Sequence, residues 1–352
     1  MFPKPTAAVV DNWLLEFACR LIDPKLDETY FVIDHYRGYY NLFDRRPSKV
    51  FFARDKILAL LQLIELIVVS DQLVYDADWS HIWAASAGLD EIKHLLRPVE
   101  PTGGSRKYSE AQDWHIDTKN DTPDIVRDGA MYYHELASSL GVAYWPSPQR
   151  AQFLSETEYV RVGSSFIMQL RSHVDSLLGG LIDDAIRPLN LTRKTLLLPG
   201  FGSTILNCVN SRHSILSAAL ELRESRDAIG FRKWLREMDI ALQSGDVNTL
   251  STALRDVEEV VISTRSGLGL QPNSDGLEFT IGLSPSIKSN VGSVRRLFHS
   301  LGSKKVHVTF LRNHFSEVLE GADLWFQIER LFPEFAPCGS SVLSEERPLR
   351  RK

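Results

Sequence analysis

The middle of the chain, from Ile205 to Val261, reads ILNCVNSRHSILSAALELRESRDAIGFRKWLREMDIALQSGDVNTLSTALRDVEEVV. Its apolar side chains recur every three or four residues, which is the period of one face of an α-helix. Short breaks such as Gly245-Asp246 separate the repeats. We therefore expect an antiparallel helical array in a predominantly α protein. The apolar stripes are Ile205, Val209, Leu216 and Leu220; Phe231, Trp234, Leu235, Met238 and Leu242; and Val247, Leu250, Leu254, Val257 and Val261.

The residues before this array also show helical periodicity. Asp11 or Asn12 can cap a first helix, and Gly141 is a typical stop after a helix. The predicted elements are helices over 7–22, 51–68, 79–96, 124–140 and 156–189, with an extended piece over 142–145. The amino-terminal half is therefore expected to be mostly helical as well.

The sequence changes character after Ile262. Glycine, serine and Pro272 indicate a loop. Residues 277–283 and 305–311 then carry β-branched or alternating apolar side chains on either side of a helix-like segment, which predicts a small α+β unit. Four regions follow from these patterns: a helical region ending in a polar loop (1–122), the central helical array (123–264), the α+β unit (265–336) and a basic, mobile tail (337–352).

Composition restricts the class of protein. A hydrophobic share of 43% with 24% charged residues is typical of a folded chain. The net charge of −5 argues against a protein whose surface as a whole attracts nucleic acid. Three widely spaced cysteines exclude a disulfide scaffold and favour a reducing compartment. The most apolar run, 57–69, is shorter than a membrane span, and no secretion signal is visible. We expect a soluble cytoplasmic protein without a membrane partner.

One pair of residues on the predicted helix 124–140 suggests chemistry. Arg127 and His134 stand six intervening residues apart, with Asp128 and Glu135 beside them. The pair resembles the Arg-x(4–6)-His motif of HEPN-type ribonucleases. That resemblance implies a helical bundle in which Arg127 stabilises the phosphate and His134 transfers a proton, with Asp128 or Glu135 orienting it. The alternative is a surface arginine and a half-buried histidine without a catalytic role.

Two further groups are candidates for binding. Asp113, His115 and Asp117 occupy every second position of a polar segment. Oxygen and nitrogen ligands of this kind suit Mg²⁺ or Mn²⁺. The alternative is a solvated acidic loop. Basic side chains gather nearer the carboxyl terminus, where they are candidates for binding a nucleic acid or an acidic partner. This basic group comprises Arg295, Arg296, Lys304, Lys305 and Arg312.

A third group of charged residues precedes the predicted boundary. Glu91 and Lys93, with Asp76 ahead of them, resemble the carboxylate and lysine core of restriction-type nucleases. That core requires residues on strands, whereas these positions are predicted to be helical. An exposed helical face with ordinary charges is the favoured interpretation.

No triad, zinc motif or nucleotide fingerprint covers the chain. The leading hypothesis is therefore a helical interaction or regulatory protein that acts through a macromolecular partner, either another protein or a second copy of itself. The alternative is a HEPN-like ribonuclease or another metal-assisted nuclease, with RNA as partner. No cofactor is predicted, except Mg²⁺ or Mn²⁺ for the nuclease.

Overall fold

The computed structural model describes residues 6–23, 49–77, 87–100, 122–148, individual residues between 150 and 177, and then 201–267, 278–279, 287–288, 305–320 and 324–333. These residues are mostly helical, as predicted. They also contain a parallel four-stranded sheet that the sequence patterns did not predict.

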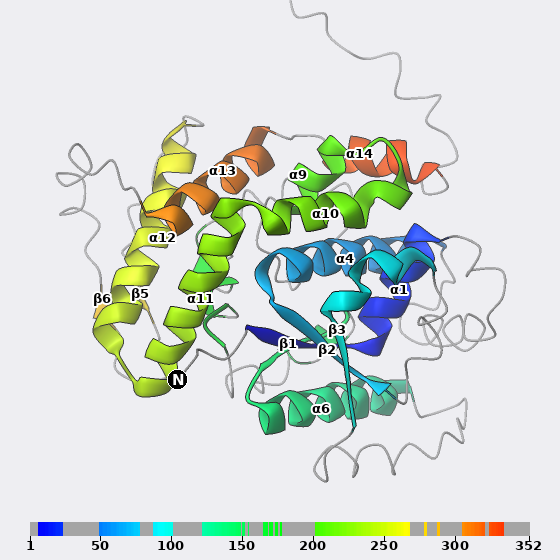
Figure 1. The fold of residues 1–352 in the computed structure, drawn as a ribbon, viewed down its shortest axis with the longest axis horizontal. Helices are drawn as coiled ribbons and strands as arrows, with labels where there is room; N and C mark the ends of the chain where they lie inside the picture. Colours follow the sequence, from blue (N-terminus) through cyan, green and yellow to red (C-terminus); the bar gives the residue numbers. More distant parts are fainter. Residues whose placement is uncertain are drawn as a thin grey trace, which may run out of the picture.

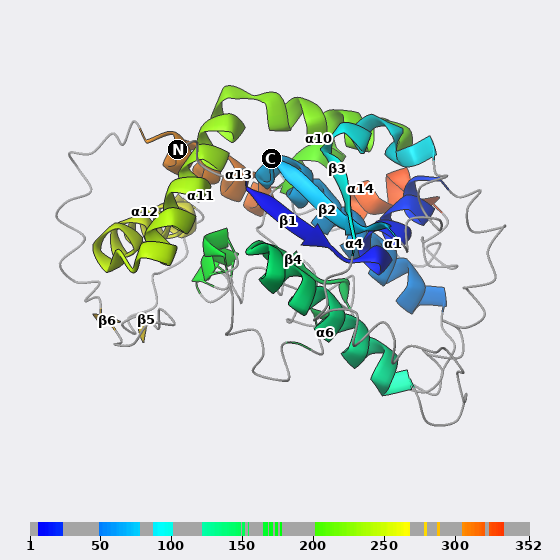
Figure 2. The same ribbon diagram turned by 60° about the horizontal axis from the view of Figure 1, so that its bottom comes forward.

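The sheet lies in the amino-terminal half and has the strand order β3-β2-β1-β4. All three strand pairs are parallel, and Val9 in β1 stands opposite Val74 in β2 and Tyr144 in β4. The strands are β1 (Ala7–Val10), β2 (Gln72–Asp76), β3 (Leu96–Val99) and β4 (Ala143–Trp145). Figure 2 shows the arrowheads of β1 and β2 pointing to the same side of the molecule.

Two predicted helices are corrected by this sheet. Residues 7–10 form β1, and the first helix α1 begins only at Asn12 and runs to Ile22, with Asp11 as its N-cap. The apolar residues of β1 are buried on both sides because helices cover both faces of the sheet, so they lack the alternation of a half-exposed strand. Similarly, the end of the helix predicted over 79–96 is the 3₁₀ helix η2 (Ala87–Leu95), followed directly by β3.

Helices flank the sheet on opposite sides (Figures 1 and 2). Helices α1 and α4 (Lys49–Val69) lie on one side, and α6 (Thr122–Leu140) lies on the other against β1 and β4. Every described residue of α4 from Lys56 to Val69 is buried, because α4 packs against α1 and also against α9 and α10. Parallel strands with helices on both faces make this half a doubly wound α/β unit.

The helical array predicted from Ile205 to Val261 is present, and α13 and α14 pack with it. The first part of the predicted region 123–264 instead contributes α6 and β4 to the α/β unit. Gly245 adopts φ +70° and ends α11, where the sequence predicted a break. Its helices are α9 (Phe201–Cys208), the 3₁₀ turn η5 (Arg212–Ser214), α10 (Ile215–Glu224), α11 (Arg226–Ser244), α12 (Val247–Gly267), α13 (Val306–Glu320) and α14 (Leu324–Leu331).

The predicted carboxyl-terminal strand over 305–311 is wrong, because α13 covers Val306–Glu320. Its buried side chains Val308, Leu311 and His314 follow a helical spacing and pack in the array, and this tertiary packing overrides the local β propensity. Two short strands, β5 (Glu278–Phe279) and β6 (Ile287–Lys288), pair antiparallel nearby in sequence. An α+β unit is therefore not established by the described residues.

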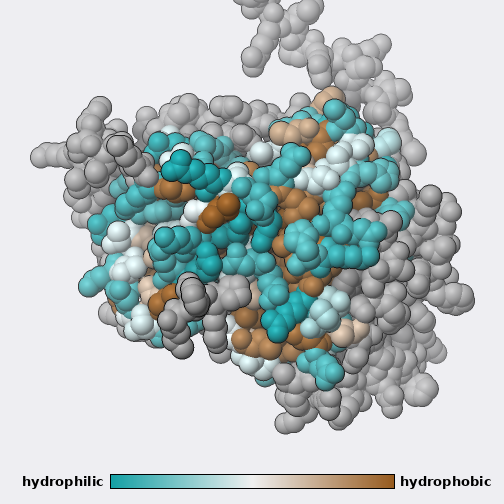
Figure 3. Space-filling model, in the orientation of Figure 1, coloured by the Kyte–Doolittle hydropathy of each residue, from teal (hydrophilic) through white to brown (hydrophobic). Residues whose placement is uncertain are grey.

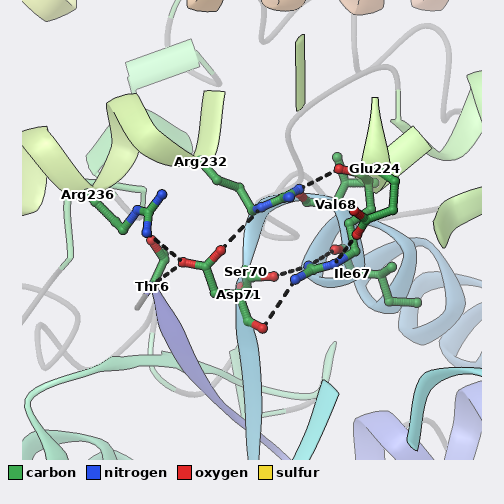
Figure 4. A network of polar contacts seen from close by, with 9 residues as sticks. Thr6, Ile67, Val68, Ser70, Asp71, Glu224, Arg232 and Arg236 are labelled. Atoms are coloured by element: carbon green, nitrogen blue, oxygen red, sulfur yellow. Dashed lines mark hydrogen bonds and ion pairs between the residues drawn. The ribbon is translucent and has the colours of Figure 1, made fainter. Parts of the chain in front are cut away.

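The array is joined to the α/β unit by a network of arginines at the turn between α4 and β2 (Figure 4). Arg223 of α10 donates to the carbonyl oxygens of Ile67 at 2.6 Å, Asp71 at 3.2 Å and Ser70. Arg232 of α11 donates to the Val68 carbonyl at 3.0 Å and lies 3.3 Å from the Asp71 carboxylate. The carbonyls of Ile67 and Val68 lie in the last turn of α4 and have no partner within the helix, and those of Ser70 and Asp71 follow it. The arginines satisfy these carbonyls and fix the two parts together.

Hydrophilic and hydrophobic residues are mixed on the face that Figure 3 shows, and neither kind forms one dominant patch there. Within the described ranges, no helix combines the length and apolar character needed to cross a membrane. The exposed large apolar side chains of the described residues, among them Ile229, Ile240 and Phe326, are dispersed over α6, α11, α12, α13 and α14.

Candidate functional site

The order of the strands identifies where a ligand site is expected in this fold. From β1 the chain proceeds outward to β2 and β3 on one side, and β4 is added on the other side of β1. In open parallel sheets, ligands bind beyond the carboxyl ends of the strands at such a reversal of strand order. At this edge, Asp11 follows β1, Asp76 ends β2, and Ser147 and Arg150 follow β4.

Asp11 is fully buried and accepts four hydrogen bonds. Its Oδ1 receives the Trp13 amide at 2.9 Å and Arg150 Nη1 at 2.5 Å. Its Oδ2 receives the Tyr144 hydroxyl at 3.0 Å and the Ser147 amide at 3.1 Å. A carboxylate has about four lone-pair sites, so these donors occupy it fully. Asp11 therefore caps α1 and ties β1 to the chain that leaves β4.

Arg150 is the cation of this cluster. Its Nη1 also donates to Asn12 Oδ1 at 3.1 Å, and its guanidinium lies 4.1 Å from the ring centroid of Trp13. Burial lowers the pKa of Arg150, but the adjacent Asp11 carboxylate raises it, and the net shift is upward. The guanidinium thus remains charged.

A glycine makes room for this guanidinium. A Cβ at Gly129 of α6 would lie 2.2 Å from Arg150 Nη2 and 2.6 Å from Nε, closer than any real Cβ contact. Helix α6 approaches Arg150 this closely only because residue 129 has no side chain.

Three tyrosines complete the cluster. Tyr132 of α6 donates its hydroxyl to Asp76 Oδ2. Tyr133 stacks on Tyr144 with ring centroids 5.9 Å apart and meets Tyr132 edge-on at 4.9 Å. Burial and the nearby Asp11 charge raise the pKa of both Tyr133 and Tyr144 well above the usual value. Both hydroxyls therefore keep their protons and are available as donors.

Among the described residues, three polar atoms of the cluster have no hydrogen-bond partner. They are Tyr133 Oη, Ser147 Oγ and Arg150 Nε, and each of the three residues is at most 2% exposed. A buried polar group without a partner costs about 1–3 kcal/mol. Fifteen such side-chain atoms occur among the described residues, and these three are among them. All three belong to residues that touch or surround Asp11 at the carboxyl edge of the sheet.

The residues predicted as catalytic lie on α6 but on its other side. The side of α6 that faces the sheet carries Gly129, Tyr132 and Tyr133, which are buried. Arg127 is 52% exposed and bonds to its neighbour Asp128 at 2.9 Å, whereas His134 and Glu135 are partly buried. Seven residues are close to two helical turns, so Arg127 and His134 share the outer side. The structure brings Arg127 and Asp128 together, and the catalytic role of the four residues stays a prediction.

The predicted metal and nucleic-acid residues fall largely outside the described part of the chain. Asp113, His115, Asp117, Arg295, Arg296 and Lys304 all lie outside the described residues. Lys305 bonds to Asp256 at 2.7 Å, and Arg312 is exposed on α13. Within the described ranges, no group of three or more His, Cys, Asp or Glu side chains is placed to hold a metal ion.

Sequence reasoning treated Asp11 only as a helix cap and did not single out Tyr133, Ser147 or Arg150. A signal was present, since Asp11 and Asp76 each follow a short apolar run, AAVV before Asp11 and LVY before Asp76. In a parallel sheet, such residues meet at one edge. The signal was missed because 7–22 was interpreted as a single helix.

No family model matches the chain, and no curated protein and no solved structure matches it either.

Proposed function

We propose that this chain binds a small polar molecule at the carboxyl edge of its parallel sheet. The binding atoms are Ser147 Oγ, Tyr133 Oη and Arg150 Nε, and the helical array supports the α/β unit that carries them. The observation behind the proposal is that these three buried atoms lack partners at the position where ligands bind in folds of this type.

The surroundings of these atoms support a preformed site. Asp11, Asn12 and the Trp13 ring fix the Arg150 guanidinium, and Tyr144 fixes the ring of Tyr133 by stacking. Side chains held in this way lose little conformational entropy when a ligand binds. The hydrogen bonds at Asp11 are complete, so the Asp11 carboxylate is not free to accept from these three atoms.

The proposal is tested by identifying small molecules that copurify with the full chain. Wild type, Tyr133→Phe/Ser147→Ala and the control Ser138→Ala are purified in parallel and denatured, and the released molecules are identified by mass spectrometry. Ser138 is exposed near the end of α6, so its hydroxyl is a matched control outside the cluster. We expect a compound that accompanies wild type and Ser138→Ala and is lost from the double variant, whose melting temperature remains close to that of wild type.

Two results would contradict this function. One is an identical set of small molecules from all three proteins. The other is no copurifying molecule, together with a metabolite library in which no compound raises the melting temperature of wild type more than that of the double variant.

A further inference from the structure

We infer that the group bound at this edge is an oxyanion, a phosphate or carboxylate oxygen, rather than a metal ion or an amine. This inference rests on the proposed function. It follows from the chemistry of the three unpartnered atoms, Arg150 Nε, Ser147 Oγ and Tyr133 Oη.

The three atoms share the ability to donate. A guanidinium nitrogen can only donate, whereas serine and tyrosine hydroxyls can donate or accept. An oxygen acceptor is the one kind of partner that suits all three. An ammonium group would leave Arg150 Nε without an acceptor and would lie beside its positive charge.

The carboxylates of the cluster are already engaged. Asp11 uses its lone pairs for Trp13, Tyr144, Ser147 and Arg150, and Asp76 accepts the Tyr132 hydroxyl. A cation at the three free atoms would therefore find Asp11 occupied and a fixed guanidinium nearby. An oxyanion instead gains charge-assisted hydrogen bonds from Arg150, which are stronger than bonds between neutral groups.

Asp76 gives the inference a sharp test because its charge has opposite effects on the two classes of ligand. The carboxylate acts electrostatically on Tyr133, so it lies within range of the bound group. Asp76→Asn removes this charge and keeps an oxygen that accepts from Tyr132. An anion should then bind more tightly, by roughly 3- to 10-fold at low ionic strength, whereas a cation should bind more weakly.

The experiment is isothermal titration calorimetry on the full chain with inorganic phosphate, AMP and citrate as oxyanion probes, and with Mg²⁺ and spermidine as cation probes. We expect at least one oxyanion probe to bind wild type. Its affinity should fall at least 10-fold in Tyr133→Phe/Ser147→Ala and rise in Asp76→Asn. Binding of phosphate and AMP without citrate assigns the site to phosphate, and the reverse pattern assigns it to carboxylate.

The outcomes separate this inference from the function on which it rests. Binding of Mg²⁺ or spermidine that is lost in the double variant and weakened by Asp76→Asn would overturn the oxyanion and leave ligand binding intact. Oxyanion binding that is unchanged in the double variant would also overturn it. If Asp76→Asn does not fold, the double variant alone decides between these results. Failure of the proposed function is recognised separately, by the copurification and library screen.

Discussion

Arg150 Nη1 lies 2.5 Å from Asp11 Oδ1, and both side chains are almost completely buried. The two residues are 139 positions apart in the sequence. Asp11 begins the chain that leaves β1 and Arg150 follows β4, so the pair joins the two strands between which the strand order reverses. It therefore holds together the edge at which we place the ligand.

Breaking this pair should destabilise the protein strongly. Arg150→Met leaves the Asp11 carboxylate buried without its cation, which costs about 3–5 kcal/mol in the free energy of unfolding. Urea denaturation measures this loss. Arg127→Met is the control, because its pair with Asp128 is exposed, and we expect it to change stability by no more than about 0.5 kcal/mol. Equal losses from the two substitutions would mean that the Arg150 pair is not a buried structural link.

The close approach at Gly129 predicts an unusual response to alanine. Within a helix, Gly→Ala normally stabilises by up to about 1 kcal/mol. At Gly129 the new methyl group would collide with the Arg150 guanidinium, so we expect a loss of about 1–3 kcal/mol in urea denaturation. Ser138→Ala on the exposed part of α6 should be neutral or slightly stabilising. Stabilisation by Gly129→Ala would show that Arg150 does not pack against α6.

The stacked tyrosines form a matched pair for a stability test. Tyr144→Phe removes a donor to the buried Asp11 carboxylate and should cost about 1–3 kcal/mol. Tyr133→Phe removes a buried hydroxyl that has no partner, so the ligand-free protein should be unchanged or more stable by up to about 1 kcal/mol. Thermal and urea denaturation of the ligand-free proteins compare them directly. A larger loss from Tyr133→Phe would indicate that its hydroxyl has a structural partner.

The helical array predicts a pH dependence of its own. Glu258 of α12 is buried, with the imidazole of His173 3.8 Å away, and burial raises the pKa of Glu258 from 4.5 to about 7. The folded state thus holds this proton more tightly than the unfolded state does. The contribution of Glu258 to stability is therefore present below pH 4.5 and is lost as the pH rises to about 7.

Glu258→Gln isolates this contribution. The stability of wild type relative to the variant should fall by roughly 2–3 kcal/mol between pH 4.5 and 7.5, at about 1.4 kcal/mol for each unit of pKa shift. Urea denaturation at a series of pH values measures the difference. Burial lowers the pKa of His173 to about 4, and this effect is present in both proteins and cancels in the comparison. A difference that stays constant with pH would contradict the raised pKa.

The helices of the array were predictable because each buries a single stripe against its neighbours. Phe231, Trp234 and Leu235 are buried in α11 at the spacing that the sequence shows, and the stop at Gly245 lies where it was predicted. Local periodicity and capping suffice for such elements.

The sheet could not be obtained in the same way. Val9 and Val10 are buried on both faces of a central strand, so they show no alternation and merge with the apolar face of α1. The site was hidden for a related reason, because Asp11 and Arg150 meet only after β1 and β4 have paired. A contact between residues 139 positions apart cannot be predicted from the local spacing of apolar side chains.

A crystal structure of the full chain with its copurifying or best-binding compound would show whether a ligand completes the hydrogen bonds at the carboxyl edge of the sheet. We expect a ligand oxygen within hydrogen-bonding distance of Ser147 Oγ and of Tyr133 Oη or Arg150 Nε. Ordered water alone at these three atoms, with the compound bound elsewhere on the protein, would contradict this expectation.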